Sequence, residues 1–440
     1  MKRLLPALFL SAACGAGLVD HGGIDLQPVA PLRCTLPQMN CGGTACASID
    51  KDPNNCGLCG RVCATPQNAT NTCEASNCGF TCNPGFFLCG GGQRCCPAVA
   101  LAAGGDTTCA VVEGSVRCWG SNDSWQLGTD PRGGLAGWSA RPVSVPGIPT
   151  AGSVAVGLKH VCAILSGTGG EVMCWGANGS VQLGVVGGNG PVKVPGVSGA
   201  QSLALGDRHS CAATGTGIVC WGANDFGQLG QGGISSTPAA PAPVTGIGAP
   251  TSISAGTSFT CAVFSGDLYC WGTNSTYQFG DSSPAFSPTP LLVNNMPAPT
   301  AVAAGDAHAC AIGSGSKLYC WGVSSSGQVG DGSTDPTSKV TGVGITPSLV
   351  AAGASHTCAV SGGSAFCWGA NNFDQLGMSS PEPTKPFQVG TISAVQKIAL
   401  GANHSCAQNG DGAVYCWGNN LSGQAGKPVG GTVPAPLPID

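Results

Sequence analysis

Residues 206–230 decide the fold of this chain. They read Gly206-Asp207-Arg208-His209-Ser210-Cys211-Ala212 and, after a short turn, Cys220-Trp221-Gly222-Ala223-Asn224-Asp225-Phe226-Gly227-Gln228-Leu229-Gly230. The tripeptide Cys-Trp-Gly occurs seven times, with successive copies 56, 46, 50, 50, 47 and 49 residues apart. Each copy is preceded by Cys-Ala and followed by a glutamine at a fixed offset. Seven copies with a period near fifty residues predict an all-β fold, a seven-bladed β-propeller with one four-stranded blade per repeat.

The composition agrees with many short strands joined by tight turns. Of 440 residues, only 9% are charged and 72 are glycine, while the mean hydropathy is +0.19. Such a chain is too apolar to be disordered and too rich in glycine and proline for long helices. The net charge of −4 gives no basic surface, so we expect no nucleic acid as a partner.

The repeat resembles the regulator of chromosome condensation repeat. The shared pattern is Gly-x-x-His-x-x-Ala, a short turn, and Trp-Gly-x-Asn-x-x-Gly-Gln-Leu-Gly, and it covers about residues 97–440. The resemblance implies the same seven-bladed propeller. Departures from the pattern are Thr107 and Phe259 for the histidine, Ser324 for the asparagine, and Trp125, Val181, Tyr277 and Asp374 for the glycine before the glutamine.

The two cysteines of each repeat are expected to pair across a hairpin. In four repeats eight residues separate them, which leaves Glu113-Gly114, Gly215-Thr216, Ser265-Gly266 or Gly362-Gly363 as a two-residue turn with the glycine that primed turns need. Directly opposed residues of a non-hydrogen-bonded pair lie near disulfide distance. The predicted pairs are Cys109 with Cys118, Cys162 with Cys174, Cys211 with Cys220, Cys261 with Cys270, Cys310 with Cys320, Cys358 with Cys367, and Cys406 with Cys416.

A repeated histidine and a repeated tryptophan flank these cysteines. Alternation along a strand puts the histidines on the face of the following cysteine and the tryptophans on the opposite face. Both faces of a blade are buried, so both sets are interpreted as packing between blades. A ring of five histidines also suits metal binding or proton transfer. The histidines are His160, His209, His308, His356 and His404.

Residues 34–96 form a separate cysteine-rich module. Its twelve cysteines are enough for six disulfides, and a stretch of this size has too few apolar residues for a core of its own. Zinc binding by Cys56-x-x-Cys59 is the competing interpretation. Twenty-seven cysteines in the chain favour pairing in an oxidising compartment, and no metal or other cofactor is expected.

Residues 1–14 have the pattern of an export signal. Lys2 and Arg3 precede an apolar run, and small residues lead to Cys14, which resembles a bacterial lipobox cysteine. Lipidation of Cys14 would anchor the protein at the outer membrane or cell surface, whereas plain cleavage would release it. Residues 15–33 are expected to be a linker, and residues 97–440 the propeller.

We predict an extracytoplasmic binding scaffold rather than an enzyme. The protein is expected to be monomeric and to present one propeller face to a protein or glycan. Loops before the repeated glutamine carry apolar residues that would form one ring, or would pack under their own loops. A secreted hydrolase or lyase using the propeller mouth is the alternative, although no catalytic motif is present. Guanine-nucleotide exchange is implied by the family resemblance alone. The candidate binding residues are Trp125, Val181, Phe226, Tyr277, Phe373 and Leu421.

Overall fold

The structure is a computed structural model that describes residues 34–41, 46–130, 137–282, 284–379, 382–390 and 392–440. Its contacts divide the chain into two compact units. One holds the residues up to 64 together with Asn71–Gly79, and the other holds Thr65–Thr70 and Phe80–Asp440. The expected export signal, the linker and Cys14 lie outside the described residues. The domain boundaries expected from the sequence stay a prediction.

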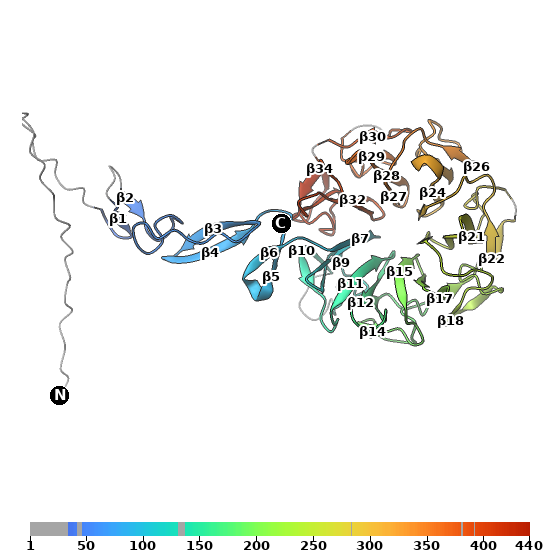
Figure 1. Cartoon of the computed structure of the whole chain (residues 1–440), viewed down its shortest axis with the longest axis horizontal. Coiled ribbons are helices and arrows are strands. Elements are labelled where there is room, and N and C mark those ends of the chain that lie inside the picture. Colours follow the sequence, from blue (N-terminus) through green and yellow to red (C-terminus); the bar gives the residue numbers. More distant parts are fainter. Residues whose placement is uncertain (1–33, 42–45, 131–136, 283, 380–381, 391) are drawn as a thin grey trace, which may run out of the picture. The chain divides into compact units, whose positions relative to one another are not determined.

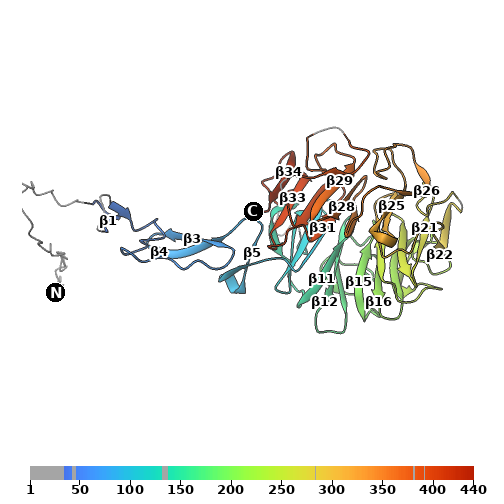
Figure 2. The ribbon, with the colours of Figure 1, turned by 45° about the horizontal axis from the view of Figure 1, so that its top comes forward.

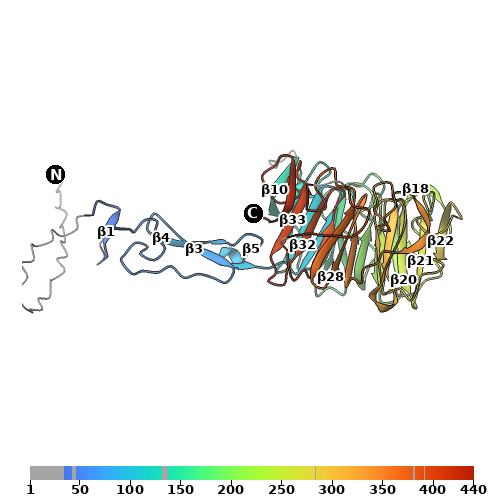
Figure 3. The same ribbon diagram turned by 90° about the horizontal axis from the view of Figure 1, so that it is seen from above.

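The second unit contains seven four-stranded antiparallel sheets arranged around a centre, as Figure 1 shows. This arrangement confirms the all-β, seven-bladed propeller. Within each blade the strands pair in sequence order, from the innermost to the outermost. Figure 3, turned by 90°, shows these strands running between the two faces of the propeller.

The blades consist of the following strands. Blade 1 is β7 (Ala100–Gly104), β8 (Thr107–Val112), β9 (Ser115–Ser121) and β10 (Trp138–Ser144). Blade 2 is β11 (Ala151–Val156), β12 (His160–Leu165), β13 (Val172–Gly176) and β14 (Val192–Lys193). Blade 3 is β15 (Ala200–Leu205), β16 (His209–Thr214), β17 (Ile218–Asn224) and β18 (Ser235–Pro243). Blade 4 is β19 (Ser252–Ala255), β20 (Phe259–Phe264), β21 (Asp267–Thr273) and β22 (Phe286–Leu292).

The remaining blades have the same plan. Blade 5 is β23 (Ala301–Ala304), β24 (His308–Ile312), β25 (Leu318–Gly322) and β26 (Thr337–Gly342), with the 3-10 turn η3 (Ser314–Ser316) in its hairpin. Blade 6 is β27 (Leu349–Ala352), β28 (His356–Ser361), β29 (Ser364–Gly369) and β30 (Phe387–Gln388). Blade 7 is β31 (Lys397–Leu400), β32 (His404–Gln408), β33 (Val414–Asn419) and β34 (Thr432–Pro438).

Burial within a blade follows strand position. The second strand is buried along its whole length in β16, because neighbouring blades cover both of its faces. The outermost strand is largely accessible, and in β18 it carries Pro238, Pro241 and Pro243. Proline lacks the N–H that a further strand would need, so these outer edges resist pairing with another chain.

The hairpin turns mostly follow the sequence expectation. Glu113 and Gly114 both have positive φ, 48° and 78°, as do Ser265-Gly266 and Gly362-Gly363, which fits primed turns. Gly215 does not adopt positive φ. There the Thr214 hydroxyl accepts hydrogen bonds from the backbone N–H groups of Thr216 and Gly217, at 3.3 and 3.1 Å, and the side chain shapes the turn.

The described part of the cysteine-rich region contains three hairpins and six disulfides. Its strands are β1 (Gln38–Asn40), β2 (Cys46–Ser48), β3 (Ala69–Glu74), β4 (Asn77–Cys82), β5 (Phe87–Cys89) and β6 (Arg94–Cys96), with a 3-10 turn η1 (Gly90–Gly92). The pairs are Cys34–Cys46, Cys41–Cys59, Cys56–Cys73, Cys63–Cys78, Cys82–Cys95 and Cys89–Cys96. Cys56 and Cys59 belong to different disulfides, so neither sulfur is a thiolate available to zinc.

Residues 80–99 close the propeller between its last and first blades, and Figure 2 shows the chain entering the ring there. In the described residues, blades 1 and 7 are each built from four consecutive strands and exchange none. Instead the backbone N–H of Gly85 donates a hydrogen bond to the Ile439 carbonyl, and the Gly85 carbonyl accepts one from the Val414 N–H. The side-chain amide of Gln408 donates to the carbonyl of Ala98 at 2.7 Å. Phe87 is 3% exposed and packs against Trp119, with ring centroids 6.2 Å apart. The end of the cysteine-rich region therefore contributes to the propeller core.

Candidate functional site

The turns between first and second strands, and the loops between third and fourth strands, lie at one end of the blades. His209 at the start of β16 pairs with Gly222 near the end of β17, so the two kinds of segment are adjacent. We call this end of the propeller the loop face. Among the described residues it consists of the turns 105–106, 157–159, 206–208, 256–258, 305–307, 353–355 and 401–403, and of the loop residues 122–130, 137, 177–191, 225–234, 274–282, 284–285, 323–336, 370–379, 382–386 and 420–431.

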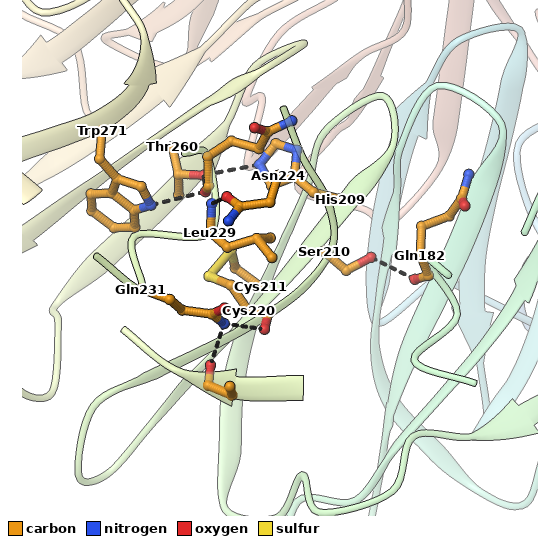
Figure 4. Close-up of a disulfide and its surroundings, with 12 residues drawn as sticks. Gln182, His209, Ser210, Cys211, Cys220, Asn224, Leu229, Gln231, Thr260 and Trp271 are labelled. Carbon is orange, nitrogen blue, oxygen red and sulfur yellow. Dashed lines mark hydrogen bonds between the residues drawn. A yellow bond between two sulfur atoms is a disulfide. The ribbon is translucent and has the colours of Figure 1, made fainter. Parts of the chain in front are cut away.

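The repeated glutamine holds neighbouring blades together through its backbone. The carbonyl of Gln228 accepts the indole N–H of Trp271 at 2.9 Å and the hydroxyl of Thr260 at 3.1 Å, both from the next blade. The Gln228 side chain accepts the backbone N–H of Phe226 at 2.9 Å, which fixes the loop. Figure 4 shows Trp271 and Thr260 of the next blade near the Cys211–Cys220 disulfide. The Trp and Gln of the repeat are therefore structural residues.

The five repeated histidines have a defined tautomer. Nε2 of His209 lies 2.9 Å from the Thr260 hydroxyl, which already donates its hydrogen to Gln228. The hydroxyl must accept from His209, so Nε2 carries the proton, and Nδ1 is buried without a partner. A Cβ on Gly206 would lie 2.3 Å from the His209 ring, which explains the glycine three residues before the histidine. The other pairs are His160–Ser210, His308–Thr357, His356–Ser405 and His404–Thr108.

Burial keeps these histidines neutral. It lowers the pKa of His209 to about 4 and that of His404 to about 3, because the charged ring would lose its hydration. None of the five is exposed, since each is 0% accessible. Their geometry fits the packing interpretation of the sequence pattern.

The two repeats without the histidine also lack its partner. Thr107 and Phe259 replace histidine in blades 1 and 4, and the residues at the partner position of the following blades are Val161 and Ala309. Each interface therefore has either both members of the hydrogen-bonded pair or neither. No buried donor or acceptor is left alone by these departures, which would be costly in the interior.

The innermost strands enclose a central cavity of about 380 Å³. Small and aliphatic residues form most of its lining, and the ionisable side chains in the lining are Asp207 and Asp306. Partial burial raises the pKa of the Asp207 and Asp306 carboxyls, because it disfavours the charged form. Asp306 nevertheless remains exposed to water. Backbone N–H groups of the loop-face turns donate hydrogen bonds to backbone carbonyls of the next blade. Asp207 donates to Thr257 and Thr257 donates to Asp306, both at 3.4 Å.

The six candidate binding residues lie on the loop face but do not occupy one equivalent position. Trp125, Val181 and Tyr277 stand directly before the glutamine, whereas Phe226 and Phe373 stand two residues before it and Leu421 three. Phe226 is 43% and Leu421 56% exposed, and the other four are half-buried. The structure thus places them on a common face at three different positions of the loop.

Three of these residues adopt an unfavourable backbone conformation. Trp125, Val181 and Tyr277 have φ of 69°, 57° and 68°, where equivalent loops have Gly227, Gly327 and Gly423 at 79°. For bulky or β-branched residues the left-handed region costs about 1–2 kcal/mol each. Asp374, with φ of 59°, has the same conformation at the equivalent position of blade 6, so four of the seven loops carry a residue other than glycine there.

Exposed apolar side chains gather on the same face. Leu158, Val186, Phe226, Ile234, Leu421 and Val429 are in its turns and loops, and Trp138 and Phe286 begin the outermost strands there. In the described remainder of blades 1–7 the exposed large hydrophobic residues are Leu292, Leu349, Phe387 and Leu437. The loop residues other than Phe226 and Leu421 follow no repeat pattern, so no sequence signal pointed to them.

The cysteines of each repeat meet as opposed residues. Cys211 pairs with Cys220 in the strand register, and the Cα–Cα distance is 4.1 Å in all seven predicted pairs. Thirteen disulfides fit an oxidising environment outside the cytoplasm. Among the described residues, no helix is long and apolar enough to cross a membrane.

The fold and the site define a seven-bladed propeller whose repeat residues join the blades and whose loops differ from one repeat to the next. The family model of the RCC1-like domain matches residues 189–439, more than half of the chain. The chain belongs to the RCC1-like domain family. Among curated proteins, none matches the chain significantly.

Solved structures show the same fold. Yeast RCC1 (Prp20), in the crystal structure of Kap60 bound to it, is 20% identical with a TM-score of 0.65, covering 74% of this chain and 83% of that chain. Prp20p of Saccharomyces cerevisiae gives 20% identity and a TM-score of 0.66, covering 74% and 86%. Human WBSCR16 gives 21% and 0.63, covering 70% and 86%. Identities this low show similarity of fold alone.

Proposed function

We propose that this protein is a binding scaffold that presents its loop face to a partner protein outside the cytoplasm. The observation that carries the proposal is the left-handed backbone of Trp125, Val181 and Tyr277. Backbone strain that persists where glycine would relieve it is typical of functional sites. On the loop face these side chains would form an apolar contact surface for another protein.

Two further observations support a binding role. Among the structural neighbours, Prp20p of Saccharomyces cerevisiae binds Gsp1p and histones, and yeast RCC1 is bound to Kap60. Proteins of this fold therefore serve as docking partners. The recurrent chemistry of the repeat in this chain is committed to joining blades, as for His209 and Trp271, which favours binding over hydrolase or lyase activity.

A lipid anchor on Cys14 is the second part of the proposal. Cys14 is the one cysteine of the 27 that follows a short apolar run near the N-terminus, and all 26 others are in disulfides. Wild-type protein is expected in the membrane fraction, and Cys14→Ser should shift it to the soluble fraction. Recovery of wild-type protein wholly in the medium, beginning after residue 14, would contradict the anchor and leave the scaffold proposal intact.

Site-specific photocrosslinking in the producing cell tests the scaffold. A benzophenone side chain replaces Phe226 or Leu421 on the loop face of the full-length protein. In matched controls it replaces Leu292 or Leu349, which are exposed at the opposite end of the blades. A discrete protein adduct from the loop face and none from the controls is expected. Equal adducts from all four positions, or none from Phe226 and Leu421, would overturn the proposal.

A further inference from the structure

The segment that crosses from blade 7 to blade 1 carries two disulfides of its own. We call residues 80–99 the clasp. Cys82–Cys95 joins the start of the clasp to β6, and Cys89–Cys96 joins β5 to β6. The β5–β6 hairpin has three residue pairs, and a two-stranded hairpin of this length is marginally stable in water. The conformation of the clasp therefore depends on its disulfides.

On one side the clasp packs on blade 7. The N–H of Gly85 donates to the Ile439 carbonyl at 2.8 Å, and the Gly85 carbonyl accepts the Val414 N–H at 3.0 Å. Gly85 has φ of 89°, and a Cβ there would lie 2.9 Å from the Cβ of Ala413. Only glycine suits this backbone conformation and this close approach, so the contact is built into the sequence.

On its other side the clasp packs on blade 1. Glu113, in the β8–β9 turn, forms an ion pair with Arg94 and accepts the N–H of Gly90 at 2.9 Å. The guanidinium of Arg117, in β9, donates to the carbonyl of Leu88. One short segment therefore holds both blades.

The junction of blades 7 and 1 differs from the other six junctions. Blades 1 to 7 follow one another along the chain, so a connecting segment crosses every other junction, whereas these two blades are at opposite ends of the repeat array. The clasp takes the place of that connection. The blade 7 loop that carries Leu421 packs on blade 1 here, because a Cβ on Gly423 would lie 2.6 Å from Ala140. A change at this junction therefore reaches the loop face.

The disulfides of the clasp are more accessible than those of the blades. Each clasp disulfide has one half-buried cysteine, Cys82 or Cys96, whereas all fourteen cysteines of the blade disulfides are 0% exposed. Thiol–disulfide exchange requires a thiolate to reach one of the two sulfur atoms. A thiol reagent can therefore attack the clasp of the folded protein before it attacks the blades.

We propose that the clasp is a redox-sensitive closure of the propeller ring. A dithiol reductant supplies two electrons and two protons to each disulfide: its thiolate attacks one sulfur, the S–S bond breaks, and the other cysteine leaves as a thiolate that takes up a proton. The second thiol of the reductant then releases the first cysteine, and the reductant becomes a cyclic disulfide. With both disulfides reduced, the clasp loses the crosslinks that shape it, and the junction of blades 7 and 1 loosens. This step needs no partner protein.

Limited reduction of the full-length protein with dithiothreitol, under native conditions, tests the accessibility. Free thiols are then alkylated and located by peptide mapping. Cys82, Cys89, Cys95 and Cys96 are expected to be alkylated while the fourteen blade cysteines stay protected. Alkylation of the blade cysteines at the same rate as those of the clasp would overturn the proposal.

Residue-resolved hydrogen exchange shows whether the junction loosens. The amide of Val414, which donates to Gly85, is expected to exchange about tenfold faster or more after reduction, because its acceptor belongs to the clasp. The amides of β20 and β21 in blade 4 are expected to keep their rates. Unchanged exchange at Val414, or equally faster exchange in blade 4, would overturn the proposal.

Two variants separate the clasp from the disulfides of residues 34–79, which dithiothreitol is also expected to reduce. Cys82→Ser/Cys89→Ser/Cys95→Ser/Cys96→Ser should exchange rapidly at Val414 without reductant. The matched control Cys41→Ser/Cys59→Ser/Cys63→Ser/Cys78→Ser also removes two disulfides and should exchange there as slowly as the oxidised wild type. Rapid exchange in the control would overturn the proposal. If the clasp variant does not fold, reduction of the wild type and of the control decides the question alone.

Discussion

His404 Nε2 lies 2.8 Å from Thr108 Oγ1, although 296 positions separate the two residues in the chain. The contact joins blade 7 to blade 1 with the same histidine–hydroxyl pair that joins four other interfaces. Thr108 and Trp119 both donate to the carbonyl of Gln424, at 3.0 Å each. The ring is therefore closed by the repeat unit itself, with residues 80–99 packed across the junction.

Histidine and its hydroxyl partner are replaced together in the repeats that lack them. A second substitution should therefore restore part of the stability that the first removes. Thr260→Ala should destabilise the protein by about 1–3 kcal/mol, because the buried Nε2–H of His209 loses its acceptor. Adding His209→Phe reproduces the Phe259–Ala309 interface and should restore part of the loss. Chemical denaturation of the two variants measures the coupling. A double variant that is less stable than the single one would contradict the interpretation of these pairs.

The neutral histidines predict loss of stability in acid. Their pKa in the folded protein is about 3 to 4, below the ordinary 6.5, so the unfolded chain binds more protons below pH 6.5. Stability is therefore complete above pH 6.5 and falls as the pH drops towards 4, by about 2 kcal/mol for each histidine at pH 5. Burial raises the pKa of Asp106, Asp207 and Asp306, which acts in the opposite sense at lower pH.

Melting temperatures at pH 7.5, 6 and 5 measure this dependence. The variant His209→Phe/Thr260→Ala removes one histidine and should have a shallower decline than the wild type. A melting temperature that is independent of pH over this range would show that the histidines are not buried in the neutral form.

The hairpin register predicts which cysteines are joined. Non-reducing peptide mapping is expected to recover the seven pairs within repeats, such as Cys211 with Cys220. Cys211→Ala/Cys220→Ala should cost about 2–3 kcal/mol on the loop-entropy model, because the closed loop is short. Crosslinks between different repeats, or free thiols in good yield, would show that the register is wrong.

Much of the fold followed from local sequence, and the contacts between blades did not. Turn length and cysteine spacing predicted strand register, because both act within one hairpin; at Gly215 the neighbouring Thr214 hydroxyl shapes the turn instead. The hydroxyl partners of the histidines were missed, since they lie about fifty residues away in the next blade. Their signal was present in Val161 and Ala309, which replace the hydroxyl wherever the preceding histidine is replaced.

The sequence predicted which face of the propeller carries the candidate binding residues, but not which positions of the loops they occupy. The loops share an end of the propeller because the repeats are equivalent. Backbone conformation distinguishes Trp125 and Tyr277, in left-handed positions, from Phe226 and Phe373, and residue type alone does not separate them.

The most direct test of the central claim compares the loop residues with the core. Trp125→Gly/Val181→Gly/Tyr277→Gly gives these positions the residue that suits their backbone, so the stability gained from relieved strain should roughly offset the lost burial. Trp221→Ala is the structural reference and should cost about 3–5 kcal/mol through a core cavity.

The deciding measurement is the yield of the Leu421 photocrosslinked adduct in the triple glycine variant, taken with its melting temperature. If the loop face is the binding surface, the adduct should be lost while the melting temperature stays near that of the wild type. An undiminished adduct, or a melting temperature that falls as far as in Trp221→Ala, would show that these side chains serve the packing of the propeller.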